Sequence, residues 1–150
     1  MTDINKLMKI IGYSFRDKSL IKTALTHSSF SKENKIKNNE RLEFLGDRVL
    51  GLIISSEIFK KNVSSTEGEL AKQQSFLVCK TTLKKVANNI KLGEFVNCTQ
   101  SLKKNSLDSI IANTLEALIA AIYLDSNINQ ASKIVLKLWK SFLENINLSS

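Results

Sequence analysis

Apolar residues recur along most of the chain at intervals of three and four, the spacing that buries one face of a helix. Alternation of apolar and polar residues, which is typical of half-buried strands, is nowhere sustained. The chain has no proline and only five glycines, so little interrupts long helices. The pattern predicts an all-α fold with about seven or eight helices. The clearest apolar stripes are Leu42, Leu45, Val49, Leu52 and Ile53; Leu115, Leu118, Ile119 and Ile122; and Ile134, Val135, Leu138, Trp139 and Phe142.

Several breaks in the pattern predict where helices begin and end. Gly12 ends a first helix, and the polar segment SKENKIKN precedes the longest apolar stretch. Thr66 followed by Glu69 is the spacing of a capping box, so a helix is expected to begin there. The segment LDSNINQA separates the last two helices. No internal repeat and no change of composition divides the chain, which predicts one domain over residues 1–150.

The net charge of the chain indicates which class of molecule it could bind. Lysine and arginine number 22 against 14 acidic residues, which gives a formal net charge of +8 and a pI near 9.5. Such an excess favours an anionic partner, usually nucleic acid, although solvated lysines on an ordinary surface explain it equally well. We expect a cytosolic protein without a membrane anchor. Cys79 and Cys98 are far apart and lack the CxxC spacing of zinc sites, and no unbroken apolar run reaches about 18 residues.

Three acids lie in line beside the most apolar segment. Glu40, Glu43 and Asp47 occupy positions i, i+3 and i+7 of a predicted helix, and Leu50 and Ile54 continue the same stripe. Carboxylates beside large apolar groups are destabilised, and neighbouring negative charges raise their pKa values. The stripe therefore needs compensation by positive charge.

Arginine and a bound cation are the two usual sources of that charge. Arg41 and Arg48 are close in sequence, but the helical period directs them about 80–100° away from the acids. We expect them to serve another surface. A hard divalent cation such as Mg²⁺ takes oxygen ligands and is the better candidate.

A second helix carries a matching polar pair. Asn113 and Glu116 lie three residues apart within the apolar, alanine-rich stretch IIANTLEALIAAIYLD. The small alanines allow another helix to approach closely. Packing the two helices together would bring Glu43, Asp47, Asn113 and Glu116 to one pocket lined with oxygen atoms. The alternative is that the acids are simply solvated on two amphipathic helices.

These segments together carry a family resemblance. NERLEFLGDRVLG resembles the signature of the ribonuclease III family, the endonucleases that cut double-stranded RNA. IGYSFRDKSLIKTALTHSSF, STEGELAK and NTLEALIAAIYLD resemble other segments of its nuclease domain, so the similarity covers nearly the whole chain. The resemblance implies a dimeric, all-α nuclease domain that hydrolyses double-stranded RNA to 5′-phosphate and 3′-hydroxyl ends. It also implies a role in processing rRNA and other precursor RNAs.

The resemblance also implies roles for individual residues. The family's metal-ion cofactor is Mg²⁺, which Mn²⁺ can replace. Asp47 and Glu116 match catalytic positions. The metal ligands correspond to Glu43, Asp47, Asn113 and Glu116, and secondary acids to Glu40 and Glu67.

Two features depart from the family pattern. Asn113 stands where the family has aspartate, so the site has one carboxylate fewer and should hold Mg²⁺ less tightly. The chain also ends where a double-stranded-RNA-binding domain normally follows, so the resemblance is to the nuclease domain alone.

For other residues we expect structural or surface roles. His27 is the only histidine, and acid–base ribonuclease chemistry without metal needs two, so we assign it a structural role. Gly46 lies inside a predicted helix, where glycine is costly, which suggests a close backbone contact, for example with a second subunit. Lysines are candidates for phosphate contacts or are merely solvated; they are those of SKENKIK together with Lys60, Lys61, Lys103 and Lys104.

Two other functions compete with a nuclease. A non-cleaving RNA-binding or scaffold protein could keep the same fold, and the neutral Asn113 favours that reading. A basic helical protein whose acids bind only a structural ion is the third possibility. The four acids Glu40, Glu43, Asp47 and Glu116 favour the enzyme.

Overall fold

The protein is all-helical, as the apolar pattern predicts. The computed structural model describes residues 3–34, 36–99 and 104–146, without the side chains of residues 33, 104 and 105. Within these ranges it contains nine α-helices and one short 3₁₀ helix, and no β-strand. The helices are α1 (Ile4–Ile11), α2 (Lys18–Ala24), α3 (Ser28–Asn34), α4 (Glu40–Lys61), α5 (Glu67–Val78), α6 (Lys80–Asn89), η1 (Leu92–Phe95), α7 (Lys104–Asp125), α8 (Ile128–Leu138) and α9 (Lys140–Asn145).

The helix count exceeds the predicted seven or eight because three helices are very short. Helices α2 and α3 have seven residues each and α9 has six, which is too few to show an apolar period. Two of the predicted boundaries are confirmed. Gly12 caps α1 in the left-handed conformation, with φ of 74°. Thr66 and Glu69 form the capping box at the start of α5.

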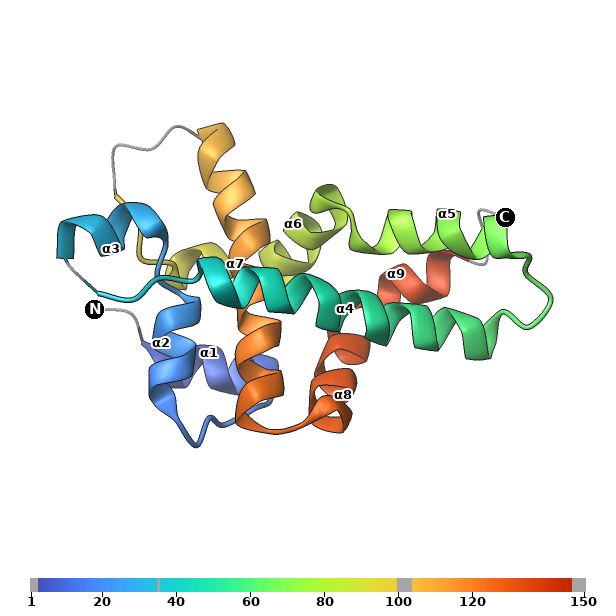
Figure 1. Ribbon diagram of the computed structural model, residues 1–150, viewed down its shortest axis with the longest axis horizontal. Helices are drawn as coiled ribbons and strands as arrows, with labels where there is room; N and C mark the ends of the chain where they lie inside the picture. Colours follow the sequence, from blue (N-terminus) through green and yellow to red (C-terminus); the bar gives the residue numbers. More distant parts are fainter. Residues whose placement is uncertain (1–2, 35, 100–103, 147–150) are drawn as a thin grey trace.

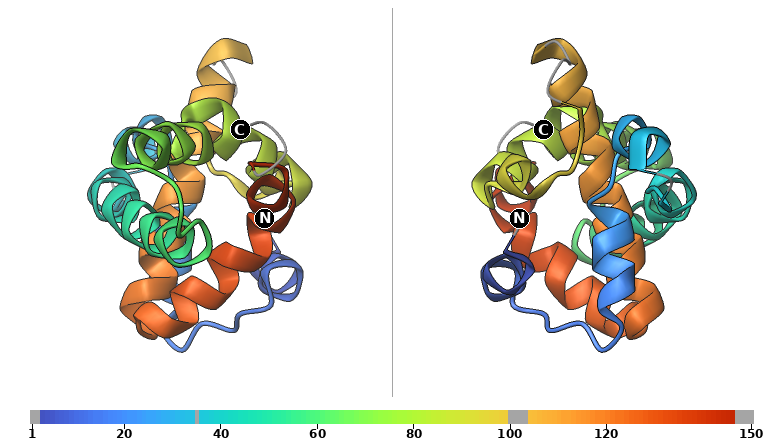
Figure 2. Two further views of the ribbon diagram at one scale, coloured as in Figure 1. Left: turned by 90° about the vertical axis from the view of Figure 1, so that its right-hand side faces the viewer. Right: turned by 90° about the vertical axis from the view of Figure 1, so that its left-hand side faces the viewer.

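Two long helices organise the molecule. Helices α4 and α7 have 22 residues each and cross near the centre of the molecule (Figure 1). Helices α4 and α5 lie on one side of α7, and α1 and α9 lie on the other (Figure 2). Within the described residues, Ser106–Asp125 is long and apolar enough to cross a membrane, but most of it is buried by the surrounding helices. This is the composition expected of a central core helix.

One hydrophobic core is shared by the described helices other than α3. Trp139 is fully buried in it, and its indole Nε1 donates a hydrogen bond to the Leu77 carbonyl oxygen at 2.8 Å. Base stacking by Trp139 is therefore excluded. The Asp125 carboxylate accepts hydrogen bonds from the Tyr13 hydroxyl and the Arg16 and Asp17 backbone, which ties the end of α7 to the α1–α2 loop.

One member of the predicted apolar stripe on α4 lies outside the core. Leu52 has 59% of its surface exposed, whereas Val49 and Ile53 are buried. Its placement in the stripe was wrong, because residues at helical spacing can border the core without entering it. Other large apolar side chains on α4 and α5 are also exposed, namely Phe44, Phe59 and Phe76.

Candidate active site

Gly46 brings the two long helices into direct backbone contact. A Cβ atom at this position would collide with the backbone carbonyl of Glu116 on α7. Only glycine fits there. The predicted close contact is therefore real, but it is made to α7 of the same chain and not to a second subunit. The contact fixes Glu116 opposite the first two turns of α4.

The crossing gathers the predicted site residues around one pocket. Glu43 and Asp47 come from α4, and Asn113 and Glu116 come from α7. The pocket has a volume of about 480 Å³ and is also lined by Glu40, Phe44, Arg48 and Lys80. All four predicted metal ligands therefore share one open cavity.

Glu116 is the most constrained acid of the pocket. Only 6% of its surface is exposed. Its pKa is raised from 4.5 to about 8, chiefly by burial and also by a hydrogen bond with Asp47 and the charges of Asp47 and Glu43. Burial likewise raises the pKa of Glu43, while Lys80 opposes both shifts. The pocket thus has a deficit of positive charge.

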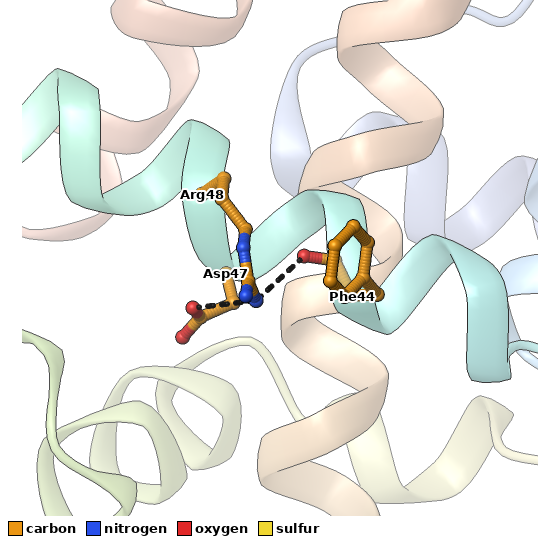
Figure 3. Close-up of polar contacts among 3 residues, drawn as sticks. All are labelled: Phe44, Asp47 and Arg48. Atoms are coloured by element: carbon orange, nitrogen blue, oxygen red, sulfur yellow. Dashed lines mark hydrogen bonds and ion pairs between the residues drawn. The ribbon is translucent and has the colours of Figure 1, made fainter.

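Arg48 supplies part of that charge, contrary to the prediction that it serves another surface. Its Nη1 lies 3.3 Å from Asp47 Oδ2, and the guanidinium carbon lies 4.0 Å from the centre of the Phe44 ring (Figure 3). A long arginine side chain can reach back around the helix, which the direction of its Cα–Cβ bond alone does not reveal. Both charged groups are largely exposed, so the pair stabilises the fold little.

Lys80 was missed by the sequence analysis. It is the first residue of α6, and its Nζ donates hydrogen bonds to Asn113 Oδ1 at 3.1 Å and to Ser109 Oγ at 3.3 Å. A lysine at the start of a helix has no motif or periodic partner that marks it as part of a site. Only the packing of α6 on α7 brings it to the pocket.

Comparison with known proteins identifies the family. The sequence profile of the Ribonuclease-III-like family matches residues 17–142. The chain belongs to this family. Ribonuclease 3 of Aliarcobacter butzleri is 42% identical to it over 99% of the chain, and ribonuclease 3 of Rickettsia felis is 41% identical over the same share. The chain spans about two thirds of these relatives, 66% and 69% of their lengths.

Solved structures place the chain among ribonuclease III nuclease domains. The nuclease domain of ribonuclease III from Campylobacter jejuni matches with a TM-score of 0.86 and 39% identity, covering 93% of this chain and 97% of that one. The structure of that protein describes flexibility in a region involved in dimer formation. Dicer from Pichia stipitis matches with a TM-score of 0.73 and 26% identity, over 90% of this chain and 60% of that one. The chain is therefore a nuclease domain of ribonuclease III type.

The donor atoms of this ribonuclease-III-like pocket suit a hard cation. Carboxylate oxygens are the ligands that Mg²⁺ prefers, and Glu43, Asp47 and Glu116 provide them. Among the described residues, no group of three or more histidine, cysteine, aspartate or glutamate side chains is already arranged to hold a metal ion. Binding would therefore require the carboxylates to draw together, which their shared cavity permits.

The remaining predicted residues of the ribonuclease-III-like chain lie away from the pocket. Glu67 is exposed at the first position of α5 and does not line the pocket. Lys60 and Lys61 lie at the far end of α4, where Lys61 pairs with Glu57 at 3.3 Å. His27 hydrogen bonds to Ser29 Oγ at 2.8 Å, in keeping with a structural role. Lys35 and Lys103 fall outside the described residues, as does the side chain of Lys104.

Proposed function

We propose that this nuclease domain hydrolyses phosphodiester bonds of double-stranded RNA with the help of divalent cations. The buried Glu116 carboxyl, facing two further acids in an open pocket, carries the proposal. An acid in such surroundings is costly unless its charge is used. We place the activity in the cytosolic processing of rRNA and other precursor RNAs.

Glu43, Asp47 and Glu116 are the residues that would hold the ions, with Mg²⁺ the expected cation and Mn²⁺ able to replace it. A bound divalent cation would help water to attack and would stabilise negative charge on the phosphate. Glu116 must release its carboxyl proton before it can act as a ligand, so binding is coupled to proton release. Glu40 adds negative charge at the rim. The expected products carry 5′-phosphate and 3′-hydroxyl ends.

The family and the charge of the chain both support double-stranded RNA as the substrate. The net charge of +8 suits a polyanion. A double-stranded RNA helix displays its phosphates and 2′-hydroxyl groups, whereas its base edges in the deep groove are hard to reach. Recognition should therefore depend on shape and backbone contacts more than on base sequence.

We further propose that the active species is a homodimer. Phe44, Leu52, Phe59 and Phe76 are exposed by 52–71% and belong to neighbouring helices α4 and α5. Exposed large apolar groups of this kind mark interaction surfaces. The Campylobacter jejuni relative has a region involved in dimer formation, which supports the same assembly here.

The experiment is a cleavage assay on a defined duplex RNA with added Mg²⁺. We expect the parent protein to cut the duplex and to leave single-stranded RNA of the same sequence intact. Asp47→Ala and Glu116→Ala should abolish cleavage and also Mg²⁺ binding measured by calorimetry. Full activity of both variants would refute the site assignment.

A non-cleaving RNA-binding scaffold is the second candidate. The observation in its favour is Asn113, whose amide oxygen already accepts a hydrogen bond from Lys80. A scaffold would bind the duplex yet leave it uncut at every Mg²⁺ and Mn²⁺ concentration. Cleavage that depends on Asp47 excludes it.

A further inference from the structure

Lys80 places a positive charge inside the acidic pocket. It lines the cavity together with Glu43, Asp47 and Glu116, and its charge opposes the rise in the pKa values of Glu43 and Glu116. Its two hydrogen bonds within the described residues, to Asn113 and Ser109, are both to neutral oxygen atoms. The ammonium charge is thus oriented by its partners without being cancelled by them.

Local helix stability does not explain a lysine at this position. Lys80 is the first residue of α6, where the positive end of the helix macrodipole disfavours a cation. The helix has no acid in its first turn that could compensate. The favourable surroundings of Lys80 are therefore the acids of α4 and α7, and not its own helix.

Lys80 is not needed to join α6 to α7, because another lysine already does so. Lys84 lies one turn further along α6, and its Nζ contacts Asp108 Oδ2 on α7 at 2.8 Å. That pair joins the two helices through opposite charges, outside the pocket. Lys80 instead contacts an amide oxygen and a hydroxyl, which leaves its charge available to a further anion.

The amide at position 113 makes this arrangement possible. An aspartate there would form an ion pair with Lys80 and neutralise it. Asn113 offers an oxygen of the same reach without the charge. The Asn113 Oδ1 atom accepts a hydrogen bond from the Lys80 ammonium. The cation at this end of the pocket is therefore the lysine side chain.

We propose that Lys80 binds a phosphate oxygen of the RNA backbone in the pocket, from a position set by Asn113 and Ser109. It thereby supplies positive charge that a divalent cation would otherwise bring to that end of the cavity. This inference rests on the proposed function for its substrate. It makes one prediction that does not depend on cleavage, namely that Lys80 repels divalent cations from the pocket.

The test compares Lys80→Ala, Lys80→Arg and Lys84→Ala with the parent protein. Lys84→Ala is the matched control, because it removes a lysine from the same helix that also contacts α7. Thermal unfolding of each variant establishes that the fold is kept. Mn²⁺ affinity is measured by calorimetry without RNA, and binding of an RNA duplex is measured in the presence of a chelator.

Lys80→Ala should bind Mn²⁺ at least threefold more tightly, bind the RNA duplex at least threefold more weakly, and lose at least tenfold in kcat/KM. Lys80→Arg should retain most of the RNA binding, and Lys84→Ala should resemble the parent in Mn²⁺ affinity. Unchanged or weaker Mn²⁺ binding by Lys80→Ala would overturn the proposal, as would unchanged RNA binding. If the parent binds RNA and Mn²⁺ but never cleaves, the nuclease assignment fails while both binding measurements still decide the role of Lys80.

Discussion

At the scale of single residues, the pocket depends on one buried acid and one missing side chain. Glu116 is held in apolar surroundings because α7 passes through the core of the protein. Gly46 lets α4 approach it at backbone distance. Each of these residues leads to a measurable prediction.

The first prediction concerns the pH dependence of stability. Folded Glu116 keeps its proton up to about pH 8, whereas in the unfolded chain it loses the proton near pH 4.5. The folded state holds more protons between these values, so the free energy of unfolding should fall as the pH rises through them. We expect Glu116→Gln, which cannot ionise, to exceed the parent in stability by about 4 kcal/mol at pH 8 and to match it at pH 4.

Urea denaturation over this pH range, without divalent cations, measures the effect. The charges facing Glu116 are Asp47 and Glu43, which raise its pKa, and Lys80, which lowers it. Glu94→Gln, at an exposed position in η1, is the control and should keep the parent's profile. Identical profiles for the parent and Glu116→Gln would show that the pKa of Glu116 is not raised in the folded protein.

The second prediction concerns the helix crossing. Gly46→Ala places a methyl group against the Glu116 backbone, and neither helix can move aside without disturbing the core. Overpacking of this kind costs about 1–3 kcal/mol or more, despite the better helix propensity of alanine. Urea denaturation measures the loss. Gly51→Ala is the matched control, since its Cβ would meet Gln74 at an ordinary 3.7 Å, and it should be neutral or stabilising.

The acids of the pocket could be predicted from the sequence, but the residues that surround them could not. Glu43, Asp47 and Glu116 could be found because acids at helical spacing in apolar segments are costly and therefore informative. Lys80 could not be found in this way, because it reaches the pocket only through the packing of α6 on α7. The sequence alone does not show which helices pack together.

At the scale of the helices, periodicity predicted the long elements well and the short ones poorly. Helices α4 and α7 each have 22 residues, enough for several repeats of an apolar stripe. The stripe did not separate buried Val49 from exposed Leu52, since both lie near its edge and burial depends on which neighbouring helix covers that edge. The start of α5 was predictable because its signal is local.

The third prediction tests that local signal. Thr66 Oγ1 accepts a hydrogen bond from the Glu69 amide at 3.2 Å, and the Glu69 carboxylate accepts one from the Thr66 amide. Thr66→Ala removes the first bond and should lower the free energy of unfolding by about 1 kcal/mol. Thr81→Ala, an exposed threonine in the first turn of α6, should change stability by less than half as much. Equal losses in the two variants would argue against a capping role for Thr66.

At the scale of the whole molecule, the exposed apolar face of α4 and α5 adjoins the pocket. Phe44 belongs to both, since it lines the cavity and is 62% exposed. A partner that covers this face would therefore also border the site. Association and activity should accordingly be linked.

The fourth prediction is that Leu52→Lys converts a dimer into a monomer. Lysine keeps the length of the side chain but cannot be buried in an apolar interface without cost. Sedimentation at micromolar concentration should give twice the chain mass of 16.8 kDa for the parent and the single mass for the variant. Leu124→Lys, at a similarly exposed leucine on α7, should stay dimeric. A monomeric parent would reject the proposed assembly.

The backbone contact at Gly46 has a consequence for how this protein can evolve. Because Gly46 meets the carbonyl of residue 116 and not its side chain, this contact does not itself depend on which side chain stands there. The acid can be replaced while the two helices stay in register. Catalytic activity could therefore be lost during evolution while the crossing of the two helices, and with it the fold, is kept.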